Sequence, residues 1–176
     1  MNAWHDISPK RINDEDFLVY IEISKGSKNK YELDKETGLL MLDRILYTST
    51  HYPANYGFIP RTLGDDGDPL DVLLLSSEAI APMTLVQCYP IGVINMLDGG
   101  KGDEKIIAIA IGDPTFNSYS DISELPSHIS EEMFHFFSVY KSLECKETAL
   151  DEICGRAKAV EVINKAIISY VDAFCK

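Results

Sequence analysis

The order of two sequence patterns along the chain constrains its fold most. In the first two thirds, short apolar segments show the period of two that is typical of β-strands, as in 17–23, where Phe17, Val19 and Ile21 alternate with their neighbours. In the last third, apolar residues recur at helical intervals. Strands followed by helices predict an α+β fold in which helices pack against the outside of a sheet.

Turn residues separate the strand segments regularly, and this spacing favours a small closed or nearly closed β-barrel. No repeat, linker or low-complexity segment divides residues 1–176, so we predict a single domain. The predicted strands are 17–23, 30–33, 39–45, 56–59, 72–75, 85–95 and 106–111. The predicted helical stripes are Ile129, Met133, Phe136, Phe137 and Tyr140, followed by Val160, Ile163, Ile167, Val171 and Phe174.

The charge of the chain limits its partners. It has 28 Asp and Glu against 16 Lys and Arg, a formal net charge of −12. Such a field repels nucleic acids and anionic membranes, so we expect neither as a partner. An anionic substrate is compatible with this charge only if divalent cations accompany it. The same acidity also fits a plain solubility role.

Several features predict a cytoplasmic protein. The four cysteines show no CxxC pair and no zinc-site spacing, which indicates free thiols in a reducing compartment. Residues 1–17 carry charges throughout and contain no apolar core of a signal peptide. The uncharged stretch 79–97 is interrupted by Pro82, Pro90 and Gly92, so we interpret it as adjacent strands rather than a membrane helix.

The densest chemical signal is the carboxylate group Asp66, Asp68 and Asp71 just before an apolar strand. If this segment is extended, Asp66 and Asp68 project to the same side. Carboxylates this close repel one another and favour hard cations such as Mg²⁺ or Mn²⁺. An ordinary acidic surface turn is the alternative. An EF-hand is excluded because Ser76 or Ser77 stands where its twelfth-position Glu is required.

A second acidic segment, 98–105, places Asp98 and Asp103 on a glycine-rich hairpin. The glycines permit a bend that brings both carboxylates toward one ion, although a solvated hairpin explains the same pattern. No Walker motif is present.

Cationic and phenolic side chains complete the set of candidate functional groups. Taken singly, each is compatible with a structural role; together with the carboxylates they suit hydrolysis of a small polyanionic phosphate. No Ser-His-Asp, Cys-His or HExxH arrangement occurs, so an activated water is the expected nucleophile. These groups are Lys30, Arg44, Tyr52, Tyr56, Tyr140 and Lys141.

The segment 66–72, DGDPLDV, resembles the D-x-D-P-x-D-V signature of soluble family I inorganic pyrophosphatases of the bacterial type. Further segments resemble the family in the same order, and the resemblance extends from about Glu22 to Lys141. They are 20–23, 30–32, 43–44, 52–57, Asp98, Asp103 with Lys105, and 140–141. The resemblance implies a five-stranded, oligonucleotide-binding-like (OB-like) β-barrel with flanking C-terminal helices, and Mg²⁺-dependent hydrolysis of pyrophosphate to two phosphates.

The resemblance also implies roles for individual residues. Several Mg²⁺ ions are expected, with Mn²⁺ or Zn²⁺ as substitutes, and the substrate is expected as a magnesium complex. Asp68 resembles the general base for a water shared between two metals. The implied metal ligands are Asp66, Asp71 and Asp103 for the first ion, with Asp71 bridging to the second, and Asp98, Asp103, Glu32 and Glu22 for the ions that come with the substrate. The implied phosphate-binding residues are Lys30, Arg44, Tyr140 and Lys141, supported by Tyr56 and Lys105.

Two points remain open from the sequence. Bacterial family members usually form hexamers, which implies a homohexamer, but Val139 and the segment 145–156 depart from the pattern of many relatives. A metal-dependent phosphatase for larger esters or nucleoside polyphosphates would use a similar set of ligands. A single-stranded nucleic-acid-binding barrel is disfavoured because it needs a basic groove with exposed aromatic residues.

Overall fold

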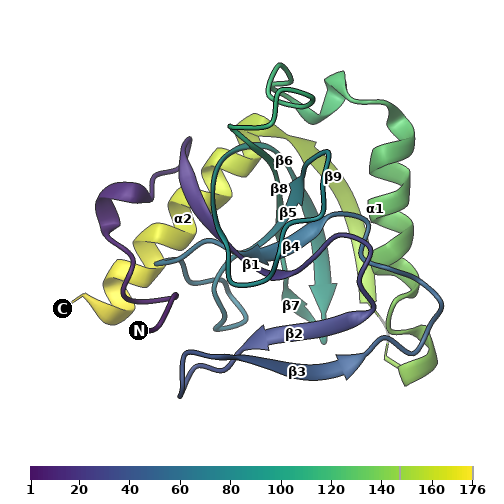
Figure 1. Cartoon of the computed structure of the whole chain (residues 1–176), viewed down its shortest axis with the longest axis horizontal. Coiled ribbons are helices and arrows are strands. Elements are labelled where there is room, and N and C mark those ends of the chain that lie inside the picture. The colour runs from purple at the N-terminus through teal and green to yellow at the C-terminus, as the bar shows by residue number, and fades with distance from the viewer. Residues whose placement is uncertain (147, 176) are drawn as a thin grey trace.

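The β-sheet of this protein curls until its two edges meet. The computed structural model describes residues 1–146 and 148–175, and its main sheet runs β1–β4–β5–β8–β6, with β6 also pairing with β1 (Figure 1). These five strands form a closed barrel, which confirms the predicted five-stranded, OB-like architecture with two C-terminal helices. Pairing is antiparallel except between β5 and β8.

Strand and helix bounds agree closely with the sequence pattern in the first two thirds of the chain. The strands are β1 (Phe17–Ile23), β2 (Asn29–Leu33), β3 (Leu40–Ile45), β4 (Asn55–Phe58), β5 (Asp71–Leu75), β6 (Leu85–Asp98), β7 (Lys101–Gly102), β8 (Lys105–Ala110) and β9 (Thr148–Gly155). The helices are η1 (Pro9–Arg11), η2 (Ile122–Glu124), α1 (Ser127–Val139), η3 (Ser142–Glu144) and α2 (Arg156–Phe174).

The uncharged stretch 79–97 contributes to one long strand, β6, and not to adjacent strands as predicted. A register shift between Pro90 and Gly92 bends this strand. On one edge its first half pairs with β1 and its second half with β9, and on the other edge β8 pairs with the middle of the strand across the bend. None of the described helices is long and apolar enough to cross a lipid bilayer.

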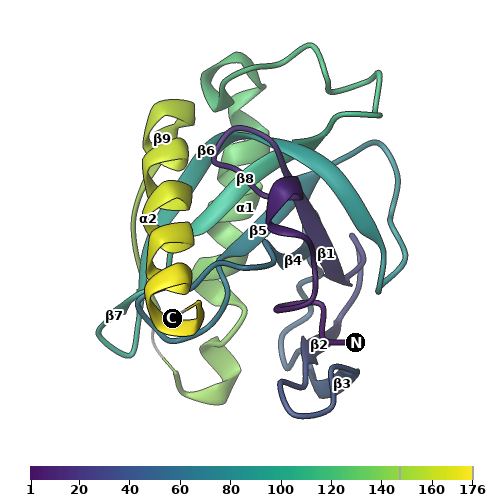
Figure 2. The same ribbon diagram turned by 90° about the vertical axis from the view of Figure 1, so that its left-hand side faces the viewer.

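Alternation along the central strands produces two apolar cores. On β8, Ile106 and Ala108 belong to the core that includes α2, whereas Ile107 and Ile109 belong to the core that includes α1. The two helices therefore cover different parts of the barrel wall, as the turned view shows (Figure 2). The predicted stripe is confirmed by the buried residues Met133, Phe136 and Phe137 of α1 and Tyr140 just after it, while Ile129 is partly buried.

The last third differs from the prediction in two respects. It contains a strand, β9, which pairs with β6 before α2 begins. The buried face of α2 is also rotated relative to the predicted stripe: Ile163 is buried as expected, but Val171 and Phe174 are about half exposed. The other buried residues of α2 include Ala159 and Ala166, whose small side chains let the helix approach the sheet closely.

The β2–β3 hairpin forms a separate two-stranded sheet beside the barrel (Figure 1). Its register places Lys30 opposite Arg44. One connection to the barrel is the buried carboxylate of Glu22 in β1, which accepts a hydrogen bond from the backbone N–H of Leu33 at 2.8 Å.

Candidate active site

A polar cleft of about 310 Å³ lies between the hairpin and one end of the barrel. The candidate residues line it except Tyr52 and Arg44, and the Arg44 guanidinium contacts Asp43 beside Lys30. The predicted residues in the cleft wall are Glu22, Lys30, Glu32, Tyr56, Asp66, Asp68, Asp71, Asp98, Asp103, Lys105, Tyr140 and Lys141.

The first carboxylate group sits on a turn that leads into β5. The condition of an extended segment is not met, because Gly67 has φ of +86° and the Asp66 side chain accepts a hydrogen bond from the backbone of Asp68 at 3.0 Å. Asp66 and Asp68 nevertheless both line the cleft. Asp71 is the first residue of β5 and pairs in parallel register with Lys105 of β8.

The second carboxylate group sits on the predicted glycine-rich hairpin. Gly99 and Gly100 have φ of +59° and +81°, and Asp98 pairs with Lys101 across the turn. Asp103 follows the hairpin, and its backbone N–H donates to the carbonyl of Met96 at 2.8 Å. Sequentially distant aspartates therefore reach the same cleft.

Lys105 is the buried cation among these carboxylates. Its Nζ lies 2.9 Å from Asp71 Oδ2, 3.3 Å from Asp103 and 2.8 Å from the Tyr56 hydroxyl, and its side chain is 3% exposed. Burial by itself disfavours the ammonium, but Asp71 and Asp103 more than offset this effect, so the pKa of Lys105 is raised well above its usual value.

The acidic residues around Lys105 carry more negative charge than it neutralises. Burial raises the pKa of Asp103 to about 6, with further contributions from Asp71 and Asp66 that oppose the effect of Lys105. Burial also raises the pKa of Asp66, and Asp71 and Asp68 add to the rise. Oxygen donors under mutual repulsion suit a hard divalent cation, so this donor set fits one.

The types of donor atom suit a divalent cation, but the carboxylates are not yet arranged as a coordination sphere. Within residues 1–146 and 148–175, no three Asp, Glu, His or Cys side chains are already arranged around a common ion position. Asp71 and Asp103 both contact Lys105, so to hold an ion they would have to turn carboxylate oxygens away from it.

Glu22 is a buried acid at the hairpin side of the cleft. Burial raises its pKa to about 8, although the hydrogen bond from Leu33 favours the carboxylate. Its neighbour across the cleft wall, Glu32, forms an ion pair with Lys30 and is half exposed.

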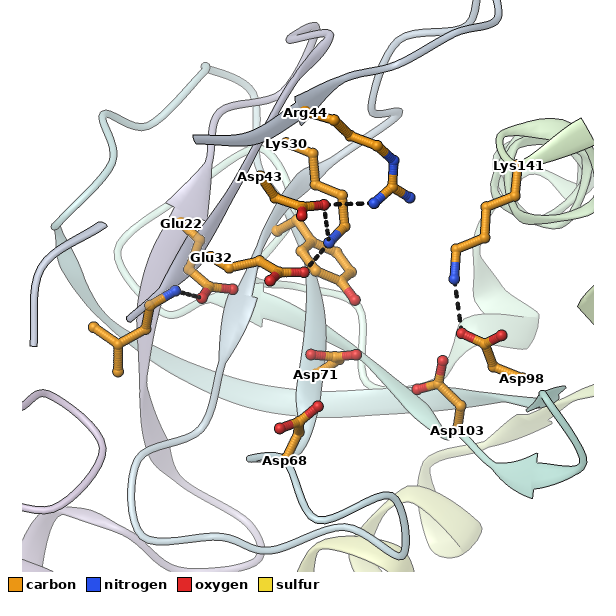
Figure 3. A network of polar contacts seen from close by, with 12 residues as sticks. Glu22, Lys30, Glu32, Asp43, Arg44, Asp68, Asp71, Asp98, Asp103 and Lys141 are labelled. Carbon is orange, nitrogen blue, oxygen red and sulfur yellow. Dashed lines mark hydrogen bonds and ion pairs between the residues drawn. The ribbon is translucent and has the colours of Figure 1, made fainter. Parts of the chain in front are cut away.

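Cations flank the carboxylates from two directions (Figure 3). On the hairpin, Lys30 Nζ lies 3.2 Å from Asp43 Oδ2, and Arg44 Nη1 donates to the same oxygen. On the other side, Lys141 just beyond α1 donates to Asp98 Oδ2 at 2.7 Å. Burial by itself raises the pKa of Asp98, but the bond from Lys141 outweighs it and the pKa is lowered.

Aromatic residues form part of the wall between these groups. Tyr56 and Tyr140 line the cleft and are both buried, with ring centroids of Phe137 at 6.3 and 5.4 Å respectively. Tyr52 is buried beside Tyr56 at a centroid distance of 5.3 Å and does not line the cleft. The packing of α1 against the barrel thus fixes the two phenols that face the cleft.

Sequence reasoning missed four residues at or near the site. Lys35 forms an ion pair with Asp68 and lies 5.5 Å above the ring of Trp4, and both residues line the cleft. Asp43 binds both Lys30 and Arg44, and Glu144 pairs with Arg44. Asp43 lies in a segment that matched the family signature, whereas the other three carry no sequence signal because only the fold brings them here.

Comparisons with known proteins agree with this geometry. The family model described as inorganic pyrophosphatase matches residues 19–171. A protein named soluble inorganic pyrophosphatase 2 from Chlamydomonas reinhardtii is 46% identical over 98% of this chain and 90% of its own length. Soluble inorganic pyrophosphatase 1 of Arabidopsis thaliana is also 46% identical, over 97% of this chain and 81% of its own.

Solved structures show the same fold. An inorganic pyrophosphatase from Helicobacter pylori superposes with a TM-score of 0.89 at 43% identity, covering 94% of this chain and 98% of its own. One from Thermus thermophilus also gives 0.89, at 36% identity, covering 97% and 99%. The chain belongs to the inorganic pyrophosphatase family.

Proposed function

We propose that this protein hydrolyses pyrophosphate to two phosphates, with divalent metal ions, Mg²⁺ in the first place, bound by the cleft carboxylates. The observation that carries the proposal is that one cleft is lined both by the carboxylates Asp66, Asp71 and Asp103 and by the cations Lys30 and Lys141. Family membership supports the same reaction.

The chain's own residues suit separate tasks. Lys30 and Lys141 approach from opposite sides and would bind the two phosphate groups, with Arg44 supporting from behind Lys30. Lys105 would bind the phosphate that is attacked, supported by the Tyr56 hydroxyl. Bound divalent cations would supply Lewis acidity and lower the pKa of the attacking water.

Asp68 is our candidate for the general base. It lines the cleft with its side chain 54% exposed, so it can reach a water in the cleft more freely than the buried Asp103 can. The remaining carboxylates, Asp66, Asp71, Asp98, Asp103, Glu32 and Glu22, are proposed metal ligands. Mn²⁺ and Zn²⁺ are proposed substitutes for Mg²⁺.

The setting of the enzyme is part of the proposal. Residues 1–176 would act as one pyrophosphatase domain in the cytoplasm, with pyrophosphate arriving as its magnesium complex. A homohexamer is proposed, supported by the large exposed apolar side chains on β3 and α2.

Phosphate release from magnesium pyrophosphate tests the proposal. Asp68→Asn should remain folded and lose at least about 100-fold in kcat, since a positioned general base contributes that much or more. The matched control is Asp65→Asn, because Asp65 lies two residues from the turn centre, is outside the cleft and pairs with exposed Lys165. Equal activity of the Asp68 variant and the wild type would remove Asp68 from this role.

Metal dependence has its own readout. The only tryptophan of the sequence, Trp4, lines the cleft, so its fluorescence should report Mg²⁺ added to chelator-treated protein. Phosphate release should stop with chelator and return with Mg²⁺. A substrate panel at fixed Mg²⁺ then separates the reactions: faster turnover of a nucleoside polyphosphate than of pyrophosphate would contradict the proposed substrate.

A further inference from the structure

A buried ion pair joins Arg44 of β3 to Glu144 at the end of η3. Arg44 Nε lies 3.0 Å from Glu144 Oε1, and the two side chains are 18% and 7% exposed. The residues are far apart in sequence, and neither lines the cleft. The contact therefore belongs to the layer of side chains behind the site.

Stability alone does not account for this pair. Removing two charges from water costs free energy that their attraction often does no more than recover, so a buried ion pair is commonly no better than an apolar contact. The hydrogen bonding here is also incomplete: among the described residues, the buried atoms Arg44 Nε, Arg44 Nη2 and Glu144 Oε2 have no hydrogen-bond partner, so the 3.0 Å contact of Nε with Glu144 is an ion pair without hydrogen-bond geometry.

The pair links the two groups of cations that flank the carboxylates. On one side, Asp43 Oδ2 binds both Arg44 and Lys30, and it thereby connects the pair to the cleft wall. On the other side, Glu144 is the last residue of η3, the short helix that directly follows Lys141 after the end of α1. The Arg44–Glu144 contact thus spans from the β2–β3 hairpin to the segment that carries Lys141.

The guanidinium of Arg44 is oriented by two carboxylates. Glu144 lies at Nε and Asp43 accepts from Nη1, so Nη2 is the end of the fork without a protein partner. Burial disfavours the charge of Arg44, but Glu144 and Asp43 more than compensate, and the pKa of the guanidinium is raised. The guanidinium is therefore held behind the cleft wall, where its contact with Asp43 connects it to Lys30.

We propose that Glu144 is a positioning residue for substrate binding: it holds Arg44, and through it the hairpin cations, at a fixed place relative to Lys141. This inference rests on the proposed function and deepens it, because it assigns the alignment of the phosphate-binding groups to a residue that does not itself contact the substrate. The carboxylate of Glu144 acts through Arg44 and takes no part in the chemical step.

Glu144→Gln is the decisive variant because it keeps the size of the side chain and removes its charge. We expect KM for magnesium pyrophosphate to rise roughly tenfold with kcat unchanged, because the charge that holds Arg44 Nε at 3.0 Å is lost and the hairpin cations are no longer aligned with Lys141. Binding of inorganic phosphate, measured by calorimetry, should weaken in parallel. Glu144→Asp, which restores the charge on a shorter chain, should recover part of the affinity.

The matched control is Glu131→Gln. Glu131 is on α1, its side chain is 69% exposed, and its neighbour is the exposed His128, so the same chemical change should leave KM and phosphate affinity as in the wild type. Thermal unfolding of all variants separates positioning from folding. A lower melting temperature and a lower kcat with an unchanged KM would show a structural role and overturn the proposal.

A double variant tests whether Glu144 acts through Arg44. If it does, Arg44→Lys combined with Glu144→Gln should bind pyrophosphate no worse than Arg44→Lys alone, because the orienting contact is already lost. Effects that add would contradict the proposal. If the wild type released no phosphate, the proposed function would fail, whereas the phosphate affinities of the Glu144 variants would still decide this inference.

Discussion

At the scale of single residues, the charge balance of the cleft depends on Lys105. Its ammonium contacts Asp71, Asp103 and the Tyr56 hydroxyl, and its side chain is 3% exposed. Without metal ions it is the buried cation that separates two aspartates from each other. Without the Lys105 ammonium, the carboxylates of Asp71 and Asp103 repel each other and the folded state loses stability. Bound divalent cations should restore part of that stability.

Lys105→Met should therefore destabilise the metal-free protein by about 3–5 kcal/mol, the usual cost of deleting one partner of a buried ion pair. For a chain of this size that loss lowers the melting temperature by roughly 10 °C. Mg²⁺ should restore more stability to this variant than to the wild type, and thermal unfolding with and without Mg²⁺ measures both. Lys101→Met on the neighbouring hairpin is the exposed control, and equal melting temperatures for the two variants would contradict the argument.

Residue types and motif spacing were sufficient to predict the groups that line the cleft. Asp66, Asp68 and Asp71 are close in sequence, so their convergence follows from the local turn. The predicted role of Arg44 in phosphate binding stays a prediction: its guanidinium contacts Asp43 and Glu144 and does not line the cleft. Lys35 and Glu144 could not be predicted, since each meets its partner only after strands and helices pack.

At the scale of elements, the start of α2 depends on a carboxylate from another segment. The residue before the helix is Gly155, which has no side chain to cap the free N–H groups. Asp121 supplies the acceptor: its Oδ2 accepts from the Arg156 N–H at 2.9 Å and its Oδ1 from the Ser123 N–H at 3.0 Å. A Cβ on residue 155 would lie 2.8 Å from Asp121 Oδ2, so glycine leaves room for this contact.

Asp121→Asn should cost about 1 kcal/mol at pH 7, since the amide has one acceptor oxygen for two N–H donors. Backbone hydrogen bonds from Ser123 and Arg156 lower the pKa of Asp121 in the folded state. Its contribution is therefore present above the unfolded-state pKa of 3.8 and is lost as the pH falls through the folded-state pKa.

Urea unfolding of wild type and Asp121→Asn across this pH range measures the effect. The difference in unfolding free energy should be constant near neutral pH and should shrink as the pH falls below 3.8. Asp151→Asn is the matched control, because Asp151 is an exposed residue of β9. A difference that stays constant down to the lowest pH would show that the charge of Asp121 is not involved.

Element prediction succeeded where local pattern and tertiary environment agree. The seven residues of β1 were predicted with their exact bounds from period-two alternation. β9 was missed because Asp151 and Glu152 interrupt its apolar alternation, and its strand conformation comes from pairing with β6. The buried face of α2 was misplaced because Ala159 and Ala166 contribute little to an apolar stripe, although both are buried in the core on the sheet side of the helix.

At the scale of the whole molecule, apolar surface remains uncovered on β3. Several large side chains on or beside this strand are at least half exposed, and one edge of the strand has no partner within the described chain. An exposed apolar patch of this kind is typical of a protein–protein interface, and we assign it to contact between copies of the chain in the proposed homohexamer. The residues are Leu39, Met41, Leu42, Ile45 and Tyr47.

If β3 contributes to the proposed homohexamer, charge on this patch should disrupt it. Met41→Asp combined with Ile45→Asp places like charges at the interface of every copy, and we expect a shift toward smaller species in sedimentation velocity, with an unchanged monomer fold by circular dichroism. Because Arg44 lies between these positions and anchors Lys30 through Asp43, dissociation should also raise KM for pyrophosphate.

The control for this prediction lies on α2, where Ile168→Asp charges the other large exposed apolar area and leaves the hairpin untouched. If sedimentation gave the wild type the mass of a single chain, 19.7 kDa, the proposed homohexamer would be wrong. If the wild type is an oligomer but only Ile168→Asp dissociates it, the interface lies on α2. In that case the exposed residues of β3 are not needed for assembly. The position of the strand is then explained by its role in the site, because β3 holds Arg44 beside Lys30, the proposed phosphate-binding lysine.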